Sequence, residues 1–456
     1  MNNVYKSGMF FLRGKMNKFV LGFVFAIVFV CGVNAKILEA GYFELENGLQ
    51  VVVVENHKAP VGLQMLFYKT GSVNDPRGKG GIAHLLEHMM FRGTKKLKDR
   101  EFDRITEKFG AKNNAFTSFG VTAYHEFTDI SKLELMLALE AERMRGLVID
   151  EEAFITERDV VLQERKQRFE TNPVTMFYEN MNKLLWQEHP LANAVSGSAE
   201  EIVNLSLDDA VDFYNRYYYP NNALLVLNGD ITLDEAKILA NKYYGKIKSG
   251  PKVEELVLPK GREIQSKVVS QIKGVKQPRF VRFYRFDAGE LSKSEELALD
   301  LLCDYLTEDD TAILYDNIVY KDKSLLSIGV SSSYENRFGG KVAIYATPVD
   351  DRQDIYEIEK IIDEGIVKAL AKLDDKELDK IKNSTLSNTI YLQENPSSSV
   401  NFVVGLLFAG YTIDEIENFD EAIKAITVDD LLKVWDKVKA SKVKVSGYVG
   451  GVSDEI

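Results

Sequence analysis

Cysteine is scarce in this chain of 456 residues. The two cysteines are Cys31 and Cys303, and no internal disulfide can form if processing removes the first. Cys303 lies in the apolar segment ALDLLCDYL, which predicts a buried thiol and not a nucleophile. The chain is therefore not a small disulfide-stabilised domain. Its length and its 45% hydrophobic content favour two or more domains with substantial cores.

Basic residues are fewer than acidic ones, with 57 lysines and arginines against 69 aspartates and glutamates. The formal net charge is −12 at pH 7, and it falls to −16 without residues 1–35, which contain four basic and no acidic side chains. No basic arm or patch remains, and an acidic body is repelled by phosphate. We therefore expect no nucleic-acid partner.

Long apolar runs are limited to FVLGFVFAIVFVC, residues 19–31, which follows four basic residues and precedes the small-residue sequence GVNA. This layout predicts a cleavable secretory signal peptide over residues 1–35, with Met16 as an alternative start to Met1. A retained anchor is the alternative, although a membrane helix needs about 20 apolar residues. The expected location is periplasmic or otherwise extracytoplasmic, with no stable membrane span after cleavage.

The order of elements repeats along the remaining sequence. The first half predicts strands at 42–56 and 62–72, an opening helix, a helical region over 132–169 and a closing strand at 221–231. The second half has a counterpart for each of four segments. The strand at 62–72 corresponds to RFVRFYRFDAG, the opening helix to KSEELALDLLCDYL, the closing strand to VKVSGYVGG, and the segment RFETNPVT to YLQENPSSS. Four matches in the same order indicate a duplicated unit of about 200 residues.

This duplication predicts an α+β fold of two homologous α/β-sandwich domains. Each would be a mixed or antiparallel sheet covered by helices, and the two would face each other. The predicted parts are an N-terminal domain over 36–249, a linker over 250–262 and a C-terminal repeat domain over 263–456. The linker is predicted from two glycines and two prolines among charged residues.

Histidine is rare, with five in the chain, yet two stand four residues apart in GGIAHLLEHMMFRG. On a helix, residues at i, i+3 and i+4 share a face, so His84, Glu87 and His88 would project into one volume. Two imidazoles supply two ligands of a catalytic zinc, and the glutamate suits a general base. The order His-x-x-Glu-His is a metal-hydrolase signature. The alternative is two histidines packed in an amphipathic helix beside a solvated glutamate.

A third ligand is expected from the segment EEAFITERDVVLQERKQRFE. Glu157 and Glu164 are seven residues apart there and so lie on one stripe of a helix. One could bind the metal while the other orients a histidine or a water, and spacing does not decide which. The segment alone would also suit a solvated charged face. His57, His125 and His189 are not expected to bind metal. Zinc is inferred over manganese or cobalt from ligand type.

The segment GIAHLLEHMMFRGT resembles the metal motif of the insulinase and pitrilysin metallopeptidases, especially the mitochondrial processing peptidase branch with its bacterial relatives. The resemblance continues through GAKNNAFTSFGVTAYHEF and spans about residues 40–450. It implies a zinc endopeptidase, with one Zn²⁺ per chain, whose two similar domains face each other as a clam shell and close on an unfolded peptide. It also implies that Glu164, 76 residues after His88, completes the ligand set with His84. Glu87 and the accessory Glu157 would then be the catalytic carboxylates.

The residues Asn114, Ala115, Phe116 and Thr117 match the edge strand with which this family binds substrate. Strand addition grips a peptide by backbone hydrogen bonds without demanding a particular sequence. The alternative is an ordinary edge strand that follows a turn.

The second half departs from the family pattern. Many members carry an arginine and, seven residues later, a tyrosine that hold the substrate across the cleft from zinc. An ungapped comparison over residues 314–333 puts Val319 and Leu326 at these positions, and neither can donate a hydrogen bond. A small shift of this alignment would instead place Tyr320 or Tyr334 at the tyrosine position.

Family heterodimers provide a reason for this absence, because there the metal-bearing subunit lacks the pair and its partner supplies it. The resemblance therefore implies a heterodimer with a homologous subunit that lacks the metal motif, with a homodimer as the alternative. Two other functions stay open. An inactive structural or chaperone-like member would be expected to lack a ligand or Glu87, and a membrane-tethered peptide-binding module would need a retained apolar segment and no metal.

Overall fold

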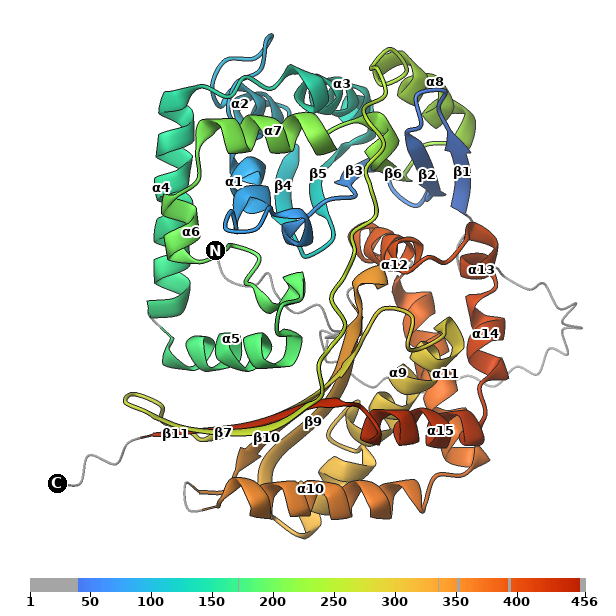
Figure 1. The fold of residues 1–456 in the computed structure, drawn as a ribbon. Coiled ribbons are helices and arrows are strands. Elements are labelled where there is room, and N and C mark those ends of the chain that lie inside the picture. The colour runs from blue at the N-terminus through green and yellow to red at the C-terminus, as the bar shows by residue number, and fades with distance from the viewer. Residues whose placement is uncertain (1–39, 171, 335, 351–352, 393–394, 452–456) are drawn as a thin grey trace, which may run out of the picture.

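The computed structural model describes residues 40–170, 172–334, 336–350, 353–392 and 395–451. It contains two mixed sheets, one in each half of the chain, with helices around them (Figure 1). The predicted signal peptide, including the apolar run at 19–31, lies outside the described residues. No helix within the described ranges combines the length and the apolar character needed to cross a membrane.

The first sheet has six strands in the order β1-β2-β6-β3-β5-β4. They are β1 (Ala40–Glu44), β2 (Gln50–Glu55), β3 (Val61–Tyr68), β4 (Lys112–Thr117), β5 (Thr122–Asp129) and β6 (Ala223–Gly229). β2 and β6 run parallel, and all other neighbours run antiparallel. The central strands β2, β3 and β6 are nearly continuous apolar runs because both of their faces are buried. In β2, for example, Val51 and Val53 enter one core, and Val52 and Val54 enter another.

The helices of the first half cover one face of this sheet. They are α1 (Ile82–Met89), α2 (Glu101–Lys108), α3 (Ile130–Gly146), α4 (Glu151–Glu170), α5 (Pro173–Trp186), α6 (Ala199–Val203), α7 (Leu207–Tyr217) and α8 (Leu233–Tyr243), with α5 as the exception described below. The helical region predicted over 132–169 is two helices. The helical conformation is interrupted between α3 and α4. There the Val148 N–H donates to the Gly93 carbonyl at 3.0 Å, and the Asp150 carboxylate caps the start of α4 by accepting a hydrogen bond from the Ala153 N–H.

The second sheet has five strands in the order β7-β11-β8-β10-β9. They are β7 (Ile264–Ile272), β8 (Arg279–Phe286), β9 (Leu325–Tyr334), β10 (Gly340–Pro348) and β11 (Val443–Gly451). β7 and β11 run parallel and the other neighbours antiparallel, which reproduces the order and direction of β2-β6-β3-β5-β4. The α+β class with two homologous domains is therefore confirmed. Residues 250–262 contain neither helix nor strand.

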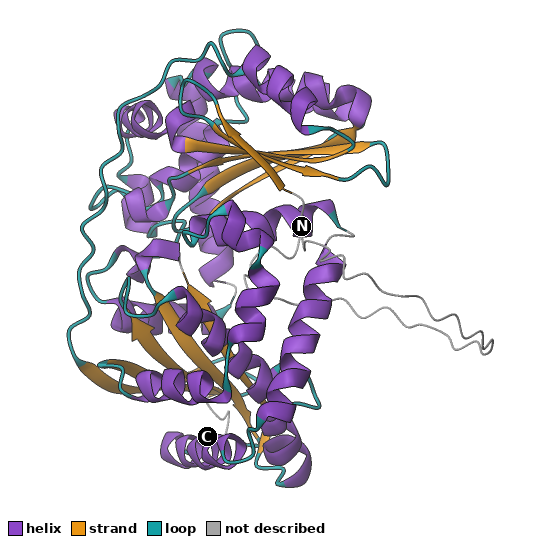
Figure 2. Cartoon of the chain, turned by 90° about the vertical axis from the view of Figure 1, so that its right-hand side faces the viewer, coloured by secondary structure: helices purple, strands orange, loops and turns teal. Residues whose placement is uncertain are grey.

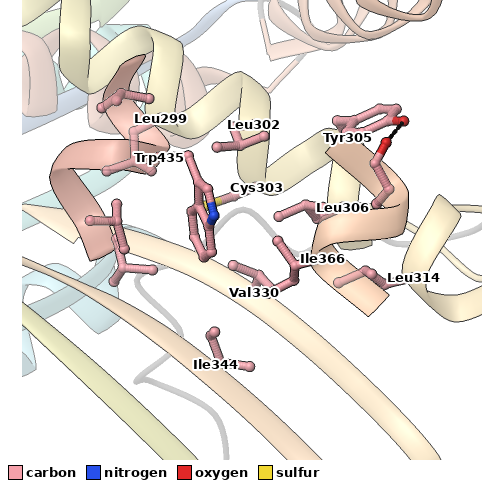
Figure 3. Close-up of a cluster of buried hydrophobic side chains, with 14 of the residues drawn as sticks. Leu299, Leu302, Cys303, Tyr305, Leu306, Leu314, Val330, Ile344, Ile366 and Trp435 are labelled. Atoms are coloured by element: carbon pink, nitrogen blue, oxygen red, sulfur yellow. Dashed lines mark hydrogen bonds between the residues drawn. The ribbon is translucent and has the colours of Figure 1, made fainter. Parts of the chain in front are cut away.

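The second half packs its own core between this sheet and its helices. The helical segments of this half are α9 (Lys293–Thr307), the short η4 (Tyr315–Lys321) and η5 (Asn336–Phe338), α10 (Ile355–Leu370), α11 (Asp375–Leu392), α12 (Pro396–Phe408), α13 (Ile413–Glu417), α14 (Phe419–Ala425) and α15 (Val428–Lys439). The buried side chains of η5 and α12 lie in other clusters. Figure 3 shows Cys303 among Leu299, Leu302 and Trp435, so the prediction of a buried structural thiol is confirmed.

The two halves exchange a helix. α5, from the first half, packs Met181 against Val281 and other residues of the second sheet, on the face away from that sheet's own helices. In return α12, from the second half, packs Val403 against Met65 and its neighbours on the first sheet. Figure 2 shows helices in the space between the two sheets. Each sheet therefore has one face covered by its own half and one by the other.

The sequence echo RFETNPVT and YLQENPSSS falls at the start of these two helices. The Asn172 side chain accepts a hydrogen bond from the Val174 N–H, and the Asn395 side chain accepts one from the Ser398 N–H. Each asparagine is an N-cap followed by proline at the first helical position, where no N–H is needed. The duplicated unit thus includes the signal that starts the exchanged helix.

Candidate metal centre

The helix α1 presents its two faces to different surroundings. Ile82, Leu85, Leu86 and Met89 are buried in the core beneath the first sheet. The opposite face carries the three polar residues His84, Glu87 and His88, which are half-buried. The spacing therefore places the three predicted side chains on one side of a single helix.

The glycines before α1 fix where the helix starts. Gly81 has φ of 90°, and a Cβ on it would lie 2.5 Å from the Ser196 carbonyl oxygen, so a side chain does not fit. Its N–H donates to Asp75 Oδ2 at 2.7 Å, and the Ala83 N–H donates to Asp75 Oδ1 at 3.1 Å. Asp75 therefore satisfies the first backbone donors of the helix that holds the histidines.

Three potential ligand atoms converge at this face. The Nε2 atoms of His84 and His88 lie 4.0 and 3.7 Å from Glu164 Oε2, and the three ligand atoms all lie within 4.8 Å of one another. Zinc bonds to such atoms measure about 2.0–2.2 Å, so two ligands of one ion stand at most about 4 Å apart. The donor set and its spacing therefore fit a catalytic zinc after small adjustments of the side chains.

The two glutamates of α4 meet different atoms. Glu157 lies on the other side of His88, where its Oε2 is 3.2 Å from Nδ1, and its Oε1 is 2.7 Å from Arg92 Nη2 and 3.6 Å from Arg100 Nη2. Glu164 faces Nε2 of both histidines. The geometry therefore separates a ligand position at Glu164 from a supporting position at Glu157, which residue spacing left undecided.

Electrostatics distinguish the two histidines. Burial and the nearby positive charges of His88 and Arg168 lower the pKa of His84 to about 3, so its imidazole is neutral at pH 7. Burial alone would lower the pKa of His88 as well, but the hydrogen bond with Glu157 and the charges of Glu164 and Glu87 raise it above its usual value. Neutral imidazole is the form that binds metal. A metal at this site would therefore compete with a proton more strongly at His88 than at His84.

Glu87 is held by the edge strand. Its Oε2 accepts a hydrogen bond from Thr117 Oγ1 at 2.5 Å. Burial raises the pKa of Glu87, and the hydrogen bond from Thr117 opposes that increase. Glu87 and His88 also line a cavity of about 320 Å³ together with Phe91, Arg92, Arg100, Asp103, Glu157 and Val160. A raised pKa and an adjacent cavity suit a group that exchanges protons with a bound molecule.

The predicted substrate-binding residues form the edge strand β4. Ala115 packs on the core that holds α1, whereas Phe116 packs edge-on against Phe67 on the opposite face, with ring centroids 6.5 Å apart. The Asn114 side chain accepts a hydrogen bond from the Ala115 N–H at 2.9 Å. The edge strand is therefore present, and one of its backbone donors is engaged by a neighbouring side chain.

The residues aligned with the family's arginine and tyrosine lie in the second half. Val319 is half-buried against the core from η4, and Leu326 is 48% exposed on β9. Of the two nearby tyrosines, Tyr320 is 54% exposed, and Tyr334 is half-buried with a hydroxyl that contacts no hydrogen-bond partner within the described ranges. None of the residues from 314 to 334 is an arginine.

Sequence reasoning missed three contributors to the site: Asp75, Arg92 and the hydroxyl of Thr117. Arg92 stands inside the histidine motif, so a charge partner for a glutamate could have been sought there. The histidines His57, His125 and His189 are not part of the cluster of ligand atoms, and His125 pairs with Asn114 across β5 and β4. His57 contacts Asp230 on the surface, and His189 accepts a hydrogen bond from the Leu191 N–H.

Comparison with known proteins identifies the family. Residues 50–199 match the model of the insulinase family, peptidase family M16, and residues 204–385 match the model of the M16 inactive domain. The zinc protease PqqE of Helicobacter pylori is 32% identical over 411 residues, which are 86% of this chain and 88% of PqqE. The chain belongs to the M16 peptidase family.

Other M16 matches agree with this assignment. The beta subunit of the mitochondrial-processing peptidase of Bos taurus is 30% identical over 215 residues, which are 47% of this chain and 44% of that subunit. The crystal structure of a protease from Helicobacter pylori superposes with a TM-score of 0.80 at 27% identity, covering 91% of this chain and all of that one. The resemblance inferred from GIAHLLEHMMFRGT is therefore confirmed at the level of the family and its two-domain fold.

Proposed function

We propose that this chain is a zinc-dependent endopeptidase that hydrolyses unfolded peptides. The convergence of His84, His88 and Glu164, with Glu87 beside them on α1, supports the proposal most directly. These three residues would hold one Zn²⁺. Two imidazoles and a carboxylate, with room for a water, form a usual donor set of catalytic zinc.

The side chains divide the work of peptide hydrolysis among them. When bound, zinc lowers the pKa of a water towards neutrality and polarises the scissile carbonyl. Glu87 accepts a proton from the attacking water and passes it to the leaving nitrogen. Glu157 keeps the ring of His88 oriented through its contact with Nδ1. Glu157 is thus a supporting carboxylate in this mechanism.

The edge strand β4 provides a binding mode for extended peptides. Asn114, Ala115, Phe116 and Thr117 would align the substrate by strand addition, which requires an unfolded segment and no defined sequence. The amide of Asn114 would move aside as a peptide replaces its hydrogen bond to the Ala115 N–H.

The chain acts as the metal-bearing subunit of a heterodimer, with a homologous subunit without the metal motif as its partner. The aliphatic residues Val319 and Leu326 at the aligned substrate-clamp positions support this assignment. A homodimer is the alternative. Residues 1–35 direct the chain out of the cytoplasm, to the periplasm or an equivalent compartment, as the basic and apolar pattern there suggests. The limits 36–249, 250–262 and 263–456 are the proposed domains and linker.

The test is cleavage of a quenched fluorescent peptide by the zinc-loaded chain without residues 1–35. The chain is assayed alone and mixed with a homologous subunit, with Glu87→Gln as the control. We expect one zinc per chain, and cleavage that requires both subunits and Glu87. Cleavage by the chain alone would contradict the heterodimer. Zinc binding without any cleavage would indicate an inactive member, and peptide binding without zinc would indicate a binding module.

A further inference from the structure

Thr117 belongs to two functional elements at once. It is the last residue of the edge strand β4, and its hydroxyl donates to Oε2 of Glu87 at 2.5 Å. We propose that Thr117 is a positioning residue that orients Glu87 for proton transfer and links this orientation to the binding of a peptide along β4. The inference rests on the proposed peptidase function and deepens it.

The register of the β4–β5 hairpin fixes the direction of the Thr117 backbone. Ser118 N–H donates to the Val121 carbonyl at 2.8 Å, so Ser118 and Val121 form a hydrogen-bonded pair. The next pair, Thr117 with Thr122, is then a non-hydrogen-bonded pair, and so is Ala115 with Tyr124. The backbone groups of Ala115 and Thr117 therefore point to the outer edge of the sheet, where an added strand would bind.

The side chain of Thr117 points in a different direction from these backbone groups. It shares a sheet face with Ala115, which packs on the core around α1, and Thr117 is only 1% exposed. Because successive side chains alternate between faces, the hydroxyl meets α1 while Phe116 meets the opposite core. One buried residue thus connects the substrate edge to the carboxylate of Glu87.

This contact has a consequence for Glu87. A carboxylate on a flexible side chain can turn about its last bond, and proton transfer requires one oxygen at a defined place. With Oε2 held by Thr117, Oε1 becomes the oxygen that exchanges protons. A peptide added along β4 would restrain the end of the strand and, through it, the Thr117 hydroxyl and Glu87.

The test compares Thr117→Val, which keeps the shape but removes the hydroxyl, with Thr117→Ser, which keeps the hydroxyl. In the zinc-loaded complex, we expect the valine variant to lower kcat by about 10- to 100-fold, with KM within about 2-fold of the parent. The serine variant should stay within about 3-fold in both. Zinc content should remain one per chain in each. If the Thr117→Val chain does not fold, Thr117→Ala takes its place in the comparison.

Thr122→Val is the matched control. Thr122 is buried next to Thr117 on β5, and its hydroxyl donates to the Thr70 carbonyl at 3.1 Å. A loss of kcat in Thr122→Val equal to that in Thr117→Val would mean that any buried hydroxyl of the hairpin matters, and would overturn the proposal. So would an unchanged kcat in Thr117→Val, or a loss that serine does not restore.

A binding measurement distinguishes a role of Thr117 in orienting Glu87 from a role in binding the peptide. The affinity of an unstructured peptide for the Glu87→Gln chain is measured with and without Thr117→Val. We expect the two dissociation constants to agree within about 2-fold, because the backbone of Thr117 is intact. A weakening of 10-fold or more would assign Thr117 to substrate binding alone. Absence of cleavage by the unmodified complex would refute the peptidase function itself, and the positioning role with it.

Discussion

In the first half, α4 brings Glu157 and Glu164 against two histidines, whereas the corresponding helix of the second half, α11, has no carboxylate at either equivalent position. Both helices precede an Asn-Pro pair. Counting back eight and fifteen residues gives Glu164 and Glu157 from Asn172, but Ser387 and Lys380 from Asn395. No histidine follows His189 in the sequence. The duplicated helix therefore keeps its place in the fold but not the two carboxylates that face the histidines in the first half.

The opening helices differ in the same way. α1 carries two histidines and Glu87, whereas α9 carries Glu296, Asp300 and Asp304 at intervals of four residues, which form an acidic stripe. The order and direction of the strands and the exchanged helices are nevertheless alike in the two halves. Apolar patterning is enough to preserve a fold, whereas a metal site depends on a few residues that can be lost separately.

The largest expected effect comes from the general base. Glu87→Gln keeps the size of the side chain and its hydrogen bond with Thr117 but cannot take a proton. We expect kcat to fall by about 10²- to 10⁴-fold with zinc content unchanged. The control is Glu296→Gln on α9 of the second half, which should leave cleavage within about 2-fold. A comparable loss in both variants would contradict the assignment of the chemistry to the first half alone.

The exchanged helices predict that the halves unfold together. Met181 on α5 is fully buried against the second sheet, so Met181→Ala should destabilise the chain by about 2–5 kcal/mol. Met176 on the same helix is 54% exposed, and Met176→Ala should change the free energy of unfolding by no more than about 0.5 kcal/mol. Calorimetry should record one cooperative transition in each. Two separate transitions, with only one shifted by Met181→Ala, would show that the halves are independent.

A smaller effect is expected from the supporting carboxylate. Glu157→Gln removes the charge that faces Nδ1 of His88, so zinc affinity should fall by about 10- to 100-fold. Lys380→Gln, at the corresponding position of α11, serves as the control and should leave the affinity unchanged. Competition with a chelator of known affinity measures both. An undiminished affinity in Glu157→Gln would mean that the hydrogen bond with His88 does not tune the site.

Several parts of the site were predictable because they depend on local periodicity. The helical repeat puts His84, Glu87 and His88 on one face whatever the rest of the fold does. The roles of Glu157 and Glu164 were not predictable from their spacing. Two residues that are two turns apart share a stripe, and the approach of α4 to α1 decides which one reaches Nε2.

The hydroxyl of Thr117 and the exchange of α5 and α12 depend on contacts between distant segments. The sequence NNAFT indicates an edge strand but not that this strand packs its last side chain on α1. The Asn-Pro caps likewise mark where two helices begin, because capping is local. The sheet that each helix covers is decided by the arrangement of the two halves, and no local pattern encodes it.

The acidic stripe of α9 gives the second half a pH dependence that can be measured. Asp304 is half-buried, and burial, with the charges of Asp300 and Glu308, raises its pKa from 3.8 to about 8. At this residue the folded chain binds more protons than the unfolded chain between about pH 4 and pH 8, so the contribution of Asp304 to the free energy of unfolding falls as pH rises through this range. The stabilisation is fully present below about pH 4 and is lost as pH passes about 8.

Asp304→Asn should weaken this dependence because asparagine stays neutral, but it should not abolish it, because burial also raises the pKa of Glu296 to about 7 and that of Asp300 to about 6. We expect the variant to melt at a higher temperature than the parent at pH 8, and the difference to shrink towards pH 4. Asp429→Asn, at an exposed residue paired with Lys433, is the control and should leave the slope of melting temperature against pH unchanged. If the slope of melting temperature against pH were the same in the parent and in Asp304→Asn, the negative charge of Asp304 would not destabilise the folded chain. The helices α1 and α9 would then differ in the metal-binding groups that they carry but not in the effect of a partly buried charge on stability.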